Sequence, residues 1–501
     1  ANQAGCGPAN SLKLSINPEP AFFESLNQET KLESSLQGGK TTSIPVSLLM
    51  TEEAVRDKIF SLSVSLSYRT YMADICTLGP LDFSIQLGAT EEFQRISNPY
   101  DASGGVARQG KLFYGRDAFI EKIIDVIDNP GIQHKSIVIY GQMRSGKTSI
   151  LQHLLPRLEE RNSHILAANL ESVGGYQNIG GASIFTKLLW DILQSGIQEA
   201  IQRKIDKGFS PLALELPSAP EEFFHNPAPE RYFISIVKNF LRHADNTPGW
   251  EQTRIILGLD EFQYIYGYMQ NGNLPPEFMI YWKALLQENL LSTILVGQDV
   301  MPKFIERYSN EFGVMEKFPV TYLSEEHAKR LIDEPIFING KSRYREQEAI
   351  DSIFQLTAGN PYYIQIICSR LVEHLNEKKH PYITRAHVKN VCESLMKGNQ
   401  KLHSEFDNLI MSGDPSNEAI PREDARAVLK NIARESRGDG YCPREEINCQ
   451  TTRPIDNILE DLYVRKVVEK HERFFNKESQ KSHYDYKIIV ELYKEWLLAN
   501  A

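Results

Sequence analysis

The chain has 501 residues, 41% of them hydrophobic and 24% charged, which is ordinary for a globular protein and enough for about three or four domains. Its net charge of −10 argues against nucleic acid as the main partner of the whole chain. No apolar run approaches the roughly 20 residues of a membrane span. The six cysteines are too few for a disulfide scaffold, and Cys368 and Cys392 occupy apolar helix positions that indicate buried thiols. We therefore expect a cytoplasmic protein.

Residues 1–96 have the pattern of a β domain. The first six, Ala1–Cys6, lack the basic and apolar segments of a signal peptide, and they lack an initial Met, which fits a chain that is trimmed, processed or part of a longer one. Ser61–Tyr68 alternates polar and apolar residues with period two, as a half-buried strand does. The expected strands are Ser43–Leu49, Ile59–Tyr68 and Leu81–Leu87. We interpret the region as a small β-sandwich without a catalytic cluster.

A linker at 97–112, with Asn98-Pro99-Tyr100 and Gly104-Gly105, precedes a segment at 113–324 in which strands and helices alternate. Such alternation predicts an α/β core, a parallel sheet covered by helices. The expected strands are Ser136–Tyr140, His164–Asn169, Arg254–Leu259 and Ser292–Val296, and the expected helices are Ile184–Ile205, Glu230–Ala244 and Pro276–Asn289.

Two further domains are predicted after this core. Residues 325–400 form a helical lid, whose helices carry apolar stripes at Glu325–Asp333, Glu346–Thr357, Pro361–Lys378 and Thr384–Met396. Residues 401–501 combine helices at Asp424–Glu435, Pro454–Leu462 and Glu491–Ala499 with paired strands at Val464–Glu472 and Tyr484–Val490. Helices and a hairpin in so short a segment predict a winged helix.

The segment Gly141–Thr148 matches the G-x-x-x-x-G-K-[ST] phosphate-binding loop and lies between an apolar strand and a predicted helix. Glycines let such a loop curl until its N–H groups point at phosphates, and the helix N-terminus adds its positive end. Lys147 would reach the β and γ phosphates of ATP, and the Thr148 hydroxyl would help to hold Mg²⁺. The loop residues assigned to nucleotide binding are Gly141, Arg144, Ser145, Gly146, Lys147, Thr148 and Ser149.

Two carboxylates end the strand Arg254–Leu259. Asp260 would orient Mg²⁺, and Glu261 would polarise the attacking water as general base, with Lys147 as its catalytic partner. The next strand ends at Gln298, whose side chain would lie beside the γ-phosphate if this strand neighbours the phosphate-loop strand. An Asp followed by Glu favours a hydrolysing enzyme, so we predict an ATPase that uses ATP/ADP and Mg²⁺.

From about residue 98 to 500 these features resemble the STAND class of signalling ATPases, a branch of the AAA+-like P-loop fold. Phe113–Arg116 looks like the motif that lies against the adenine in that class, and Gly359–Pro361 looks like its G-x-P motif, where Pro couples nucleotide to the lid. The same segments could instead be a hydrophobic staple and an ordinary helix-start turn. The resemblance implies a winged helix packed on the core, self-association or an effector partner, and often a role in antiphage defence. It also implies nucleotide contacts from Tyr114, Gly115, Arg116 and Pro361.

The main alternative is a replication-initiator-like AAA+ ATPase, which also joins this core to a winged helix and grips duplex DNA. From Lys401 to Ala501 there are 16 Lys and Arg residues against 19 Asp and Glu, whereas a DNA-gripping module should be basic. A basic patch at Val464–Lys481, which includes Arg465 and encloses Phe474-Phe475, keeps nucleic acid as a less favoured partner. A third interpretation is a switch in which nucleotide locks an oligomer and turnover is incidental.

Overall fold

The computed structural model divides into two compact units, Ala1–Gln94 and Arg95–Ala501. No helix of the described residues is long and apolar enough to cross a membrane. Most of the predicted linker, with Gly104-Gly105, lies outside the described residues. The residues described are 7–17, 19, 22–25, 29–32, 35–37, 40–43, 46–51, 54, 59–70, 72, 74–86, 93–100, 112–129, 135–176, 181–275, 277–313, 315–398, 400–410, 419–476 and 481–500.

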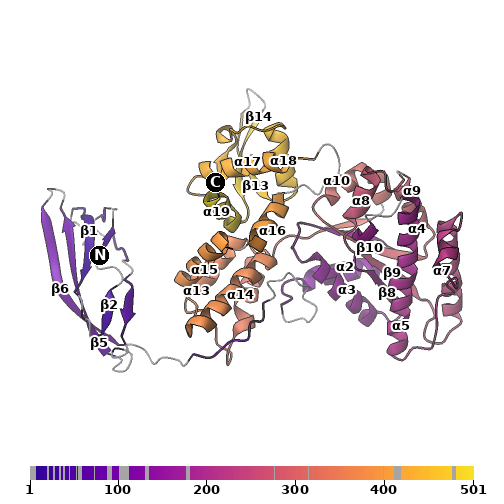
Figure 1. Cartoon of the computed structure of the whole chain (residues 1–501), viewed down its shortest axis with the longest axis horizontal. Helices are drawn as coiled ribbons and strands as arrows, with labels where there is room; N and C mark the ends of the chain where they lie inside the picture. Colours follow the sequence, from indigo (N-terminus) through magenta and orange to yellow (C-terminus); the bar gives the residue numbers. More distant parts are fainter. Residues whose placement is uncertain are drawn as a thin grey trace. The chain divides into compact units, whose positions relative to one another are not determined.

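The N-terminal unit contains two antiparallel sheets (Figure 1), one in the order β3-β1-β5-β6 and one that pairs β2 with β4. A small core of Ile16, Phe23 and Phe60 draws side chains from both sheets, because the period-two pattern of β5 directs alternate residues inward. Three of these strands overlap the predicted ones. The strands are β1 (Asn10–Ile16), β2 (Phe23–Ser25), β3 (Glu29–Leu32), β4 (Leu48–Met50), β5 (Ile59–Arg69) and β6 (Ile75–Gln86).

The central sheet is parallel and has the order β11-β7-β10-β9-β8. Its strands are β7 (Ile137–Tyr140), β8 (Ile165–Leu170), β9 (Arg254–Leu259), β10 (Leu291–Gly297) and β11 (Glu316–Pro319). The prediction of a parallel α/β core is confirmed, and β10 does neighbour β7. The sequence analysis missed β11, because Glu-Lys-Phe-Pro lacks an apolar run and occupies the edge of the sheet, where a strand needs less burial.

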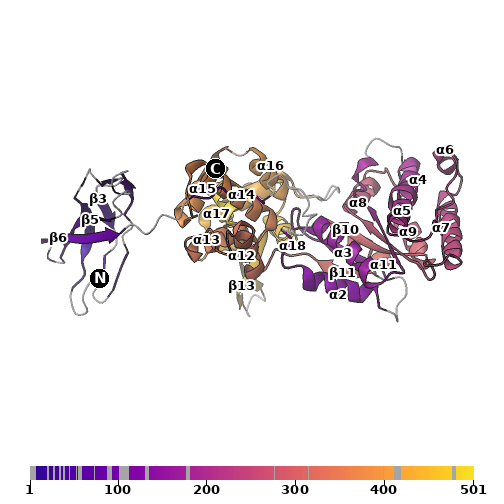
Figure 2. The same cartoon turned by 90° about the horizontal axis from the view of Figure 1, so that it is seen from below.

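Helices cover both faces of this sheet, and the strand residues alternate between two cores. Ile137 and Ile139 face the core formed with α2 and α3, whereas Val138 faces the core formed with α4, α5 and α7. Figures 1 and 2 show these two groups of helices on opposite sides of β8, β9 and β10. The predicted helix at 184–205 is a continuous run of α4, η2 and α5, and η2 is a π-helical segment.

The helices of the core are α2 (Asp117–Ile127), α3 (Lys147–Arg161), α4 (Gly181–Asp191), η2 (Ile192–Gln198), α5 (Glu199–Asp206), α6 (Pro220–Phe224), α7 (Pro229–Asp245), α8 (Gln263–Gln270), α9 (Phe278–Gln287), α10 (Met301–Arg307) and α11 (Ser309–Phe312).

The helices after the core pack as a bundle. They are α12 (Glu325–Asp333), α13 (Gln347–Thr357), α14 (Pro361–Lys378), α15 (Arg385–Gly398) and α16 (Gln400–Ile410). The buried hydroxyl of Tyr100 donates to the Ile332 carbonyl oxygen at 2.5 Å, so this linker residue packs into the bundle.

The last segment contains α17 (Arg422–Glu435), α18 (Ile455–Val464), α19 (Glu491–Ala499) and a sheet of β12 (Cys442–Pro443), β14 (Lys481–Ile488) and β13 (Val468–Asn476) in that order. The strand expected from Val464 begins only at Val468, because α18 continues to Val464 and the chain turns at Arg465 and Lys466. One hydrophobic core runs from Leu331 in α12 to Leu497 in α19. The helical bundle and the C-terminal segment therefore form a single packed body.

Helix α14 begins with a cap that gives a direct test of local stability. The buried Asn360 side chain accepts hydrogen bonds from the backbone N–H groups of Tyr362 and Tyr363 at 2.9 and 3.3 Å. We expect Asn360→Ala to lower the free energy of unfolding by about 1–2 kcal/mol and Asn360→Ser to recover most of it, because serine also caps. Urea unfolding followed by circular dichroism measures this. Asn246→Ala, at an exposed helix end, is the control, and equal effects at both positions would contradict the capping role.

Candidate nucleotide-binding site

A cavity of about 330 Å³ lies where β7, β9 and β10 end, between the core and α14. It gathers most of the residues predicted from the sequence, and they come from five separate segments. Gly115 and Gly141 are the two predicted residues that do not line it. The predicted residues that line it are Tyr114, Arg116, Arg144, Ser145, Gly146, Lys147, Thr148, Ser149, Asp260, Glu261, Gln298 and Pro361.

The shape of the phosphate-binding loop requires two glycines, one for a close backbone contact and one for a left-handed backbone conformation. At Gly141 a Cβ atom would lie 2.4 Å from the Val320 carbonyl oxygen, so the loop can leave β7 beside the end of β11 only without a side chain. Gly146 has φ +91° at the N-cap of α3, in the left-handed region that glycine tolerates. The loop therefore delivers Lys147 and Thr148 at the first turn of α3.

Lys147 is buried, and its ammonium donates a hydrogen bond to the Gln142 carbonyl oxygen at 2.6 Å. Burial lowers the pKa of Lys147 to about 8, although Asp299, Asp260 and Glu261 favour the charged form. A buried cation with few anionic partners is a strong site for phosphate oxygens, because anion binding replaces lost hydration.

Thr148 and Asp260 meet at the centre of the site. The Thr148 hydroxyl donates to the Asp260 carboxylate at 2.6 Å, and burial raises the pKa of Asp260 against the opposing effect of this hydrogen bond. A hydroxyl and a carboxylate oxygen at this distance match the hard oxygen ligands that Mg²⁺ takes, with phosphate oxygens and waters filling the other positions. The two residues therefore fit a Mg²⁺–nucleotide complex.

Glu261 is held by a residue that the sequence analysis missed. Its carboxylate accepts a hydrogen bond at 2.6 Å from the hydroxyl of Ser172, which follows β8. Glu261 also has φ +57°, a left-handed conformation that costs a non-glycine residue free energy. The strain and the hydrogen bond fix the carboxylate, and the Ser172 hydroxyl occupies one of the acceptor positions that a water could use. A serine two residues beyond a strand carries no signal in one sequence.

Gln298 lies at the end of β10 and lines the cavity, as predicted from its position. Its backbone N–H donates to the Gln263 side chain at 3.2 Å, which fixes the strand end beside β9. The side chain of the next residue, Asp299, pairs with the Arg465 guanidinium instead. Asp299 was not among the residues predicted from the sequence.

The segment Phe113–Arg116 lies beside the phosphate-binding loop. Only part of this segment is free to contact the adenine base of a nucleotide. The Phe113 ring stacks on His153 of α3, with ring centroids 3.9 Å apart, and Tyr114 packs under Arg330 of α12. Arg116 is buried and donates to the carbonyl oxygens of Ser145 at 3.3 Å and Thr321 at 2.6 Å. Burial lowers the pKa of Arg116 to about 10. This guanidinium therefore holds the phosphate loop in position at the wall of the cavity.

The segment Gly359–Pro361 is a helix start, and its Pro361 also lines the cavity. Asn360 caps α14 and Pro361 is its first residue, so the segment is a helix start. The Gly359 carbonyl oxygen accepts a hydrogen bond from the Leu323 N–H at 3.0 Å, and Pro361 lines the cavity together with Leu323. The start of α14 thus lies against the nucleotide cavity and is tied to the segment that leaves the core.

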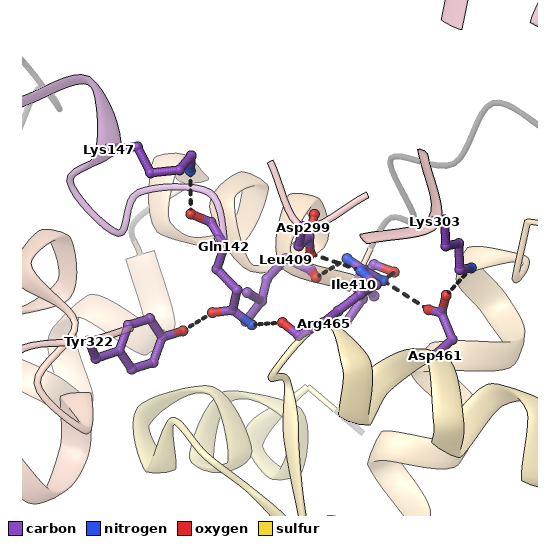
Figure 3. Close-up of polar contacts among 9 residues, drawn as sticks. All are labelled: Gln142, Lys147, Asp299, Lys303, Tyr322, Leu409, Ile410, Asp461 and Arg465. Atoms are coloured by element: carbon purple, nitrogen blue, oxygen red, sulfur yellow. Dashed lines mark hydrogen bonds and ion pairs between the residues drawn. The ribbon is translucent and has the colours of Figure 1, made fainter. Parts of the chain in front are cut away.

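Gln142, within the phosphate loop, connects three parts of the protein (Figure 3). Its carbonyl oxygen accepts from Lys147, its side-chain oxygen accepts from the Tyr322 hydroxyl, and its side-chain nitrogen donates to the Arg465 carbonyl oxygen at 2.7 Å. Gln142 and Lys147 are buried. A variable position of the G-x-x-x-x-G-K-[ST] pattern therefore carries the contact between the loop and the C-terminal segment.

Arg465 is the residue that Gln142 contacts, and its side chain is only 4% exposed. Its guanidinium pairs with Asp299 at 2.9 Å and Asp461 at 3.4 Å and donates to the Leu409 and Ile410 carbonyl oxygens (Figure 3). Its assignment to a solvent-facing basic patch is therefore wrong, because charge along the sequence does not reveal partners brought by the fold. The side chains of Phe474-Phe475, Lys477 and Lys481 lie outside the described part of the chain.

Two further ion pairs cross between the same bodies. Arg144 of the phosphate loop pairs with the nearly buried Glu405 of α16 at 2.8 Å, and its guanidinium lies 4.8 Å from the centre of the Tyr362 ring. Lys303 of α10 pairs with Asp461 of α18 at 2.7 Å. Arg144 therefore lines the cavity but is engaged by the lid rather than aimed freely at phosphate.

Comparison with known proteins agrees with this geometry. The sequence signature of a family described as an ATPase domain predominantly from Archaea matches residues 113–367, just over half of the chain. The match includes Gly141–Thr148, Asp260-Glu261 and Gly359–Pro361. No curated protein matches the chain.

Solved structures of similar fold come from several proteins. The Aeropyrum pernix ORC2 protein in ADPNP–ADP complexes has 13% identity and a TM-score of 0.46, with 77% of this chain and 94% of that chain covered. The Aeropyrum pernix ORC1 protein in complex with DNA has 13% identity, a TM-score of 0.36 and coverages of 77% and 93%. A variant of Thermotoga maritima RuvB has 13% identity, a TM-score of 0.33 and coverages of 64% and 76%. These similarities concern the fold alone.

The lowered pKa of Lys147 predicts a pH dependence of nucleotide binding. Phosphate binds the ammonium form, so affinity is full below the pKa and falls as pH rises through about 8. We expect the Kd for ADP to rise about tenfold between pH 7 and 9, measured by calorimetry, because about one lysine in ten stays charged at pH 9. Lys147→Arg, which stays charged, should bind with a flat pH profile. A flat profile for the unmodified protein would contradict the assignment.

The contact between Ser172 and Glu261 predicts opposite effects of two substitutions. Glu261→Gln should lower the steady-state rate of phosphate release by about 100-fold or more with ATP binding retained, because the general base is lost. Ser172→Ala should leave the rate unchanged or raise it severalfold, because the carboxylate no longer has a competing donor. A loss of rate in Ser172→Ala as large as in Glu261→Gln would show that Ser172 acts in the reaction itself.

Proposed function

Because this chain belongs to the ATPase domain family found predominantly in Archaea, it is an ATP-hydrolysing P-loop enzyme, and we propose that it is an AAA+-type switch. ATP with Mg²⁺ occupies the cavity, Thr148 and Asp260 hold the metal ion, and Glu261 activates water. The proposed domains are a β-sandwich at 1–96, a linker at 97–112, the ATPase core at 113–324, a lid at 325–400 and a winged helix at 401–501. The lid and winged helix respond to nucleotide as one body.

The observation that carries this proposal is the double use of Gln142. The Lys147 ammonium gives one of its three donors to the Gln142 carbonyl oxygen, and we infer that a bound phosphate draws the ammonium away from that oxygen. The same residue holds the winged helix through the Arg465 carbonyl oxygen. Nucleotide binding therefore alters the loop residue on which the winged helix rests, and this gives the two conformations different affinities for nucleotide, as a switch requires.

The interface between the two bodies is suited to opening. Polar contacts at Gln142, Arg144, Asp299 and Lys303 carry it. Beside them lies a cavity of about 580 Å³ lined by residues of both bodies, such as Val320 and Val464. An interface with such a void loses less apolar burial on separation than a packed core does. By contrast, the lid and winged helix share one continuous core and would stay together. The segment around Tyr322 is the natural hinge.

The output that we propose is signalling through a protein partner, as in the STAND class, by self-association or by an effector. The strand β6, which ends its sheet among the residues that the structure describes, supports this, because it exposes four large apolar side chains, a typical feature of protein-docking surfaces. These are Ile75 at 68% exposure, Leu78 at 51%, Leu81 at 49% and Phe83 at 49%.

The alternative function is a DNA-binding, replication-initiator-like ATPase, and one structure of similar fold was solved in complex with DNA. The charges of the C-terminal segment favour a protein partner instead. Helix α18, which would face DNA in a winged helix, contains three acidic and no basic residues. Nearby basic side chains are engaged by acids, as in the pairs Lys470–Glu460 and Arg473–Glu445. Paired cations offer little to phosphate.

The switch predicts that loosening the winged helix accelerates nucleotide exchange. We expect Arg465→Met to increase the dissociation rate of a fluorescent ADP analogue and the radius of gyration measured by X-ray scattering. A charged hydrogen bond contributes about 1.5–3 kcal/mol, so the open form should gain about tenfold or more. Asp299→Asn, which breaks the core side of the same pair, should act in the same direction.

Lys238→Ala is the control, because it removes an exposed ion pair with Glu288 far from this interface. If Arg465→Met and Lys238→Ala exchange ADP equally slowly, the switch mechanism is wrong. The Arg465→Met protein also tests the alternative output. If release of the winged helix gives the variant salt-sensitive binding of duplex DNA at physiological ionic strength, that result would show that the output is DNA binding and not signalling.

A further inference from the structure

Three histidines meet at the far end of the lid from the nucleotide cavity. His374 lies near the end of α14, His380 lies two residues after that helix ends, and His387 lies in the first turn of α15. One ring nitrogen from each lies within 4.8 Å of the others, and all three side chains are half-buried. The His380 and His387 rings stack with centroids 4.7 Å apart.

The backbone holds the three rings together. Lys379 adopts φ +54° and ends α14, and the His380 N–H bonds to the Leu375 carbonyl oxygen at 3.1 Å, which folds His380 back toward His374. Ile383 is then fixed by backbone hydrogen bonds to Arg343 and Arg345, at 2.7 and 2.9 Å. The turn between α14 and α15 therefore cannot easily separate these side chains.

The protonation chemistry of the cluster suits a metal ion. Burial, then neighbouring His380 and Lys378, lowers the pKa of His374, and burial with the other two histidines lowers the pKa of His387. At His374 and His387 burial thus favours the neutral imidazole, the form that binds metal. A backbone hydrogen bond at Tyr382 opposes the shift of His387, and such a carbonyl is the usual partner for the second nitrogen of a ligating ring.

The distances are close to those of a three-histidine site. With Zn–N bonds of about 2.0–2.1 Å, tetrahedral geometry places ligand nitrogens about 3.4 Å apart. The rings must therefore close by about 1.4 Å at most, which rotation of half-buried side chains supplies. The Nδ1 atom of His387 must also give up its long 3.3 Å contact with the Thr384 N–H. Partial exposure leaves a fourth position for water.

We propose that His374, His380 and His387 form a binding site for one divalent transition-metal ion of the zinc type. Imidazole suits Zn²⁺, Ni²⁺, Co²⁺ and Cu²⁺, whereas Mg²⁺ and Ca²⁺ prefer oxygen. The ion joins α14 to α15 across their connecting turn and so stabilises the lid. The site lies outside the nucleotide cavity and does not depend on the proposed switch.

Calorimetry of the purified, chelator-treated full chain with ZnCl₂ tests the proposal. We expect one Zn²⁺ per chain at this site and a melting temperature that rises by several degrees on addition of Zn²⁺ and returns on addition of a chelator, because a ligand of the folded state stabilises it. CoCl₂ should give visible d–d bands of a tetrahedral nitrogen site without thiolate charge-transfer absorption. Cobalt thiolate absorption would assign the ion to cysteines and overturn the proposal.

The single variants His374→Gln, His380→Gln and His387→Gln should each weaken Zn²⁺ binding by about tenfold or more, because three ligands become two. His225→Gln, at an exposed helix end, is the matched control and should bind as the unmodified chain does. ATP turnover without added Zn²⁺ should be equal in all five proteins. If no stoichiometric binding occurs, or if the three variants bind like His225→Gln, the three histidines are only a stacked cluster.

Discussion

The structure depends on how the buried ammonium of Lys147 is satisfied. A charged group removed from water needs an acceptor, and without phosphate that acceptor is the Gln142 carbonyl oxygen at 2.6 Å. Gln142 in turn fixes Tyr322 and the Arg465 turn. Gln142 therefore holds the phosphate loop through its backbone carbonyl oxygen and the C-terminal segment through its side chain. A change at one contact would reach the other within a single residue.

The carboxylate of Glu261, the proposed general base, is also held by a contact with a distant segment. Glu261 sits in a left-handed conformation and is bound by Ser172, so its resting position is over-determined by the surrounding strands. Asp260, one residue earlier, is held by Thr148 in the first turn of α3. Metal binding would draw on Thr148 and Asp260, and water activation would use the acceptor positions of Glu261 that Ser172 does not occupy. Residues of other segments thus hold both carboxylates at the end of this strand.

Local patterns predicted much of this protein from its sequence. The phosphate loop, the Asp260-Glu261 pair and helix α14 follow from residues adjacent in the chain, and the structure brings them into one cavity. The features that were missed depend on contacts between distant segments. Arg465 looked like part of a basic surface because its partner Asp299 is 166 residues away. Strand β11 was not predicted, because a strand at the edge of a sheet needs few apolar residues and its sequence therefore shows no apolar run.

Helix α14 shows why a metal ion and a nucleotide at its two ends need not act on each other. Pro361 lines the nucleotide cavity and His374 lies 13 residues further along, about 20 Å at 1.5 Å per residue. After Pro361 the helix contains no proline or glycine that could bend it. A metal that joins His374 to α15 would therefore stiffen the lid without moving Pro361. Coupling between the sites would arise only if nucleotide changed the packing between α14 and α15, rather than the position of the lid as a whole.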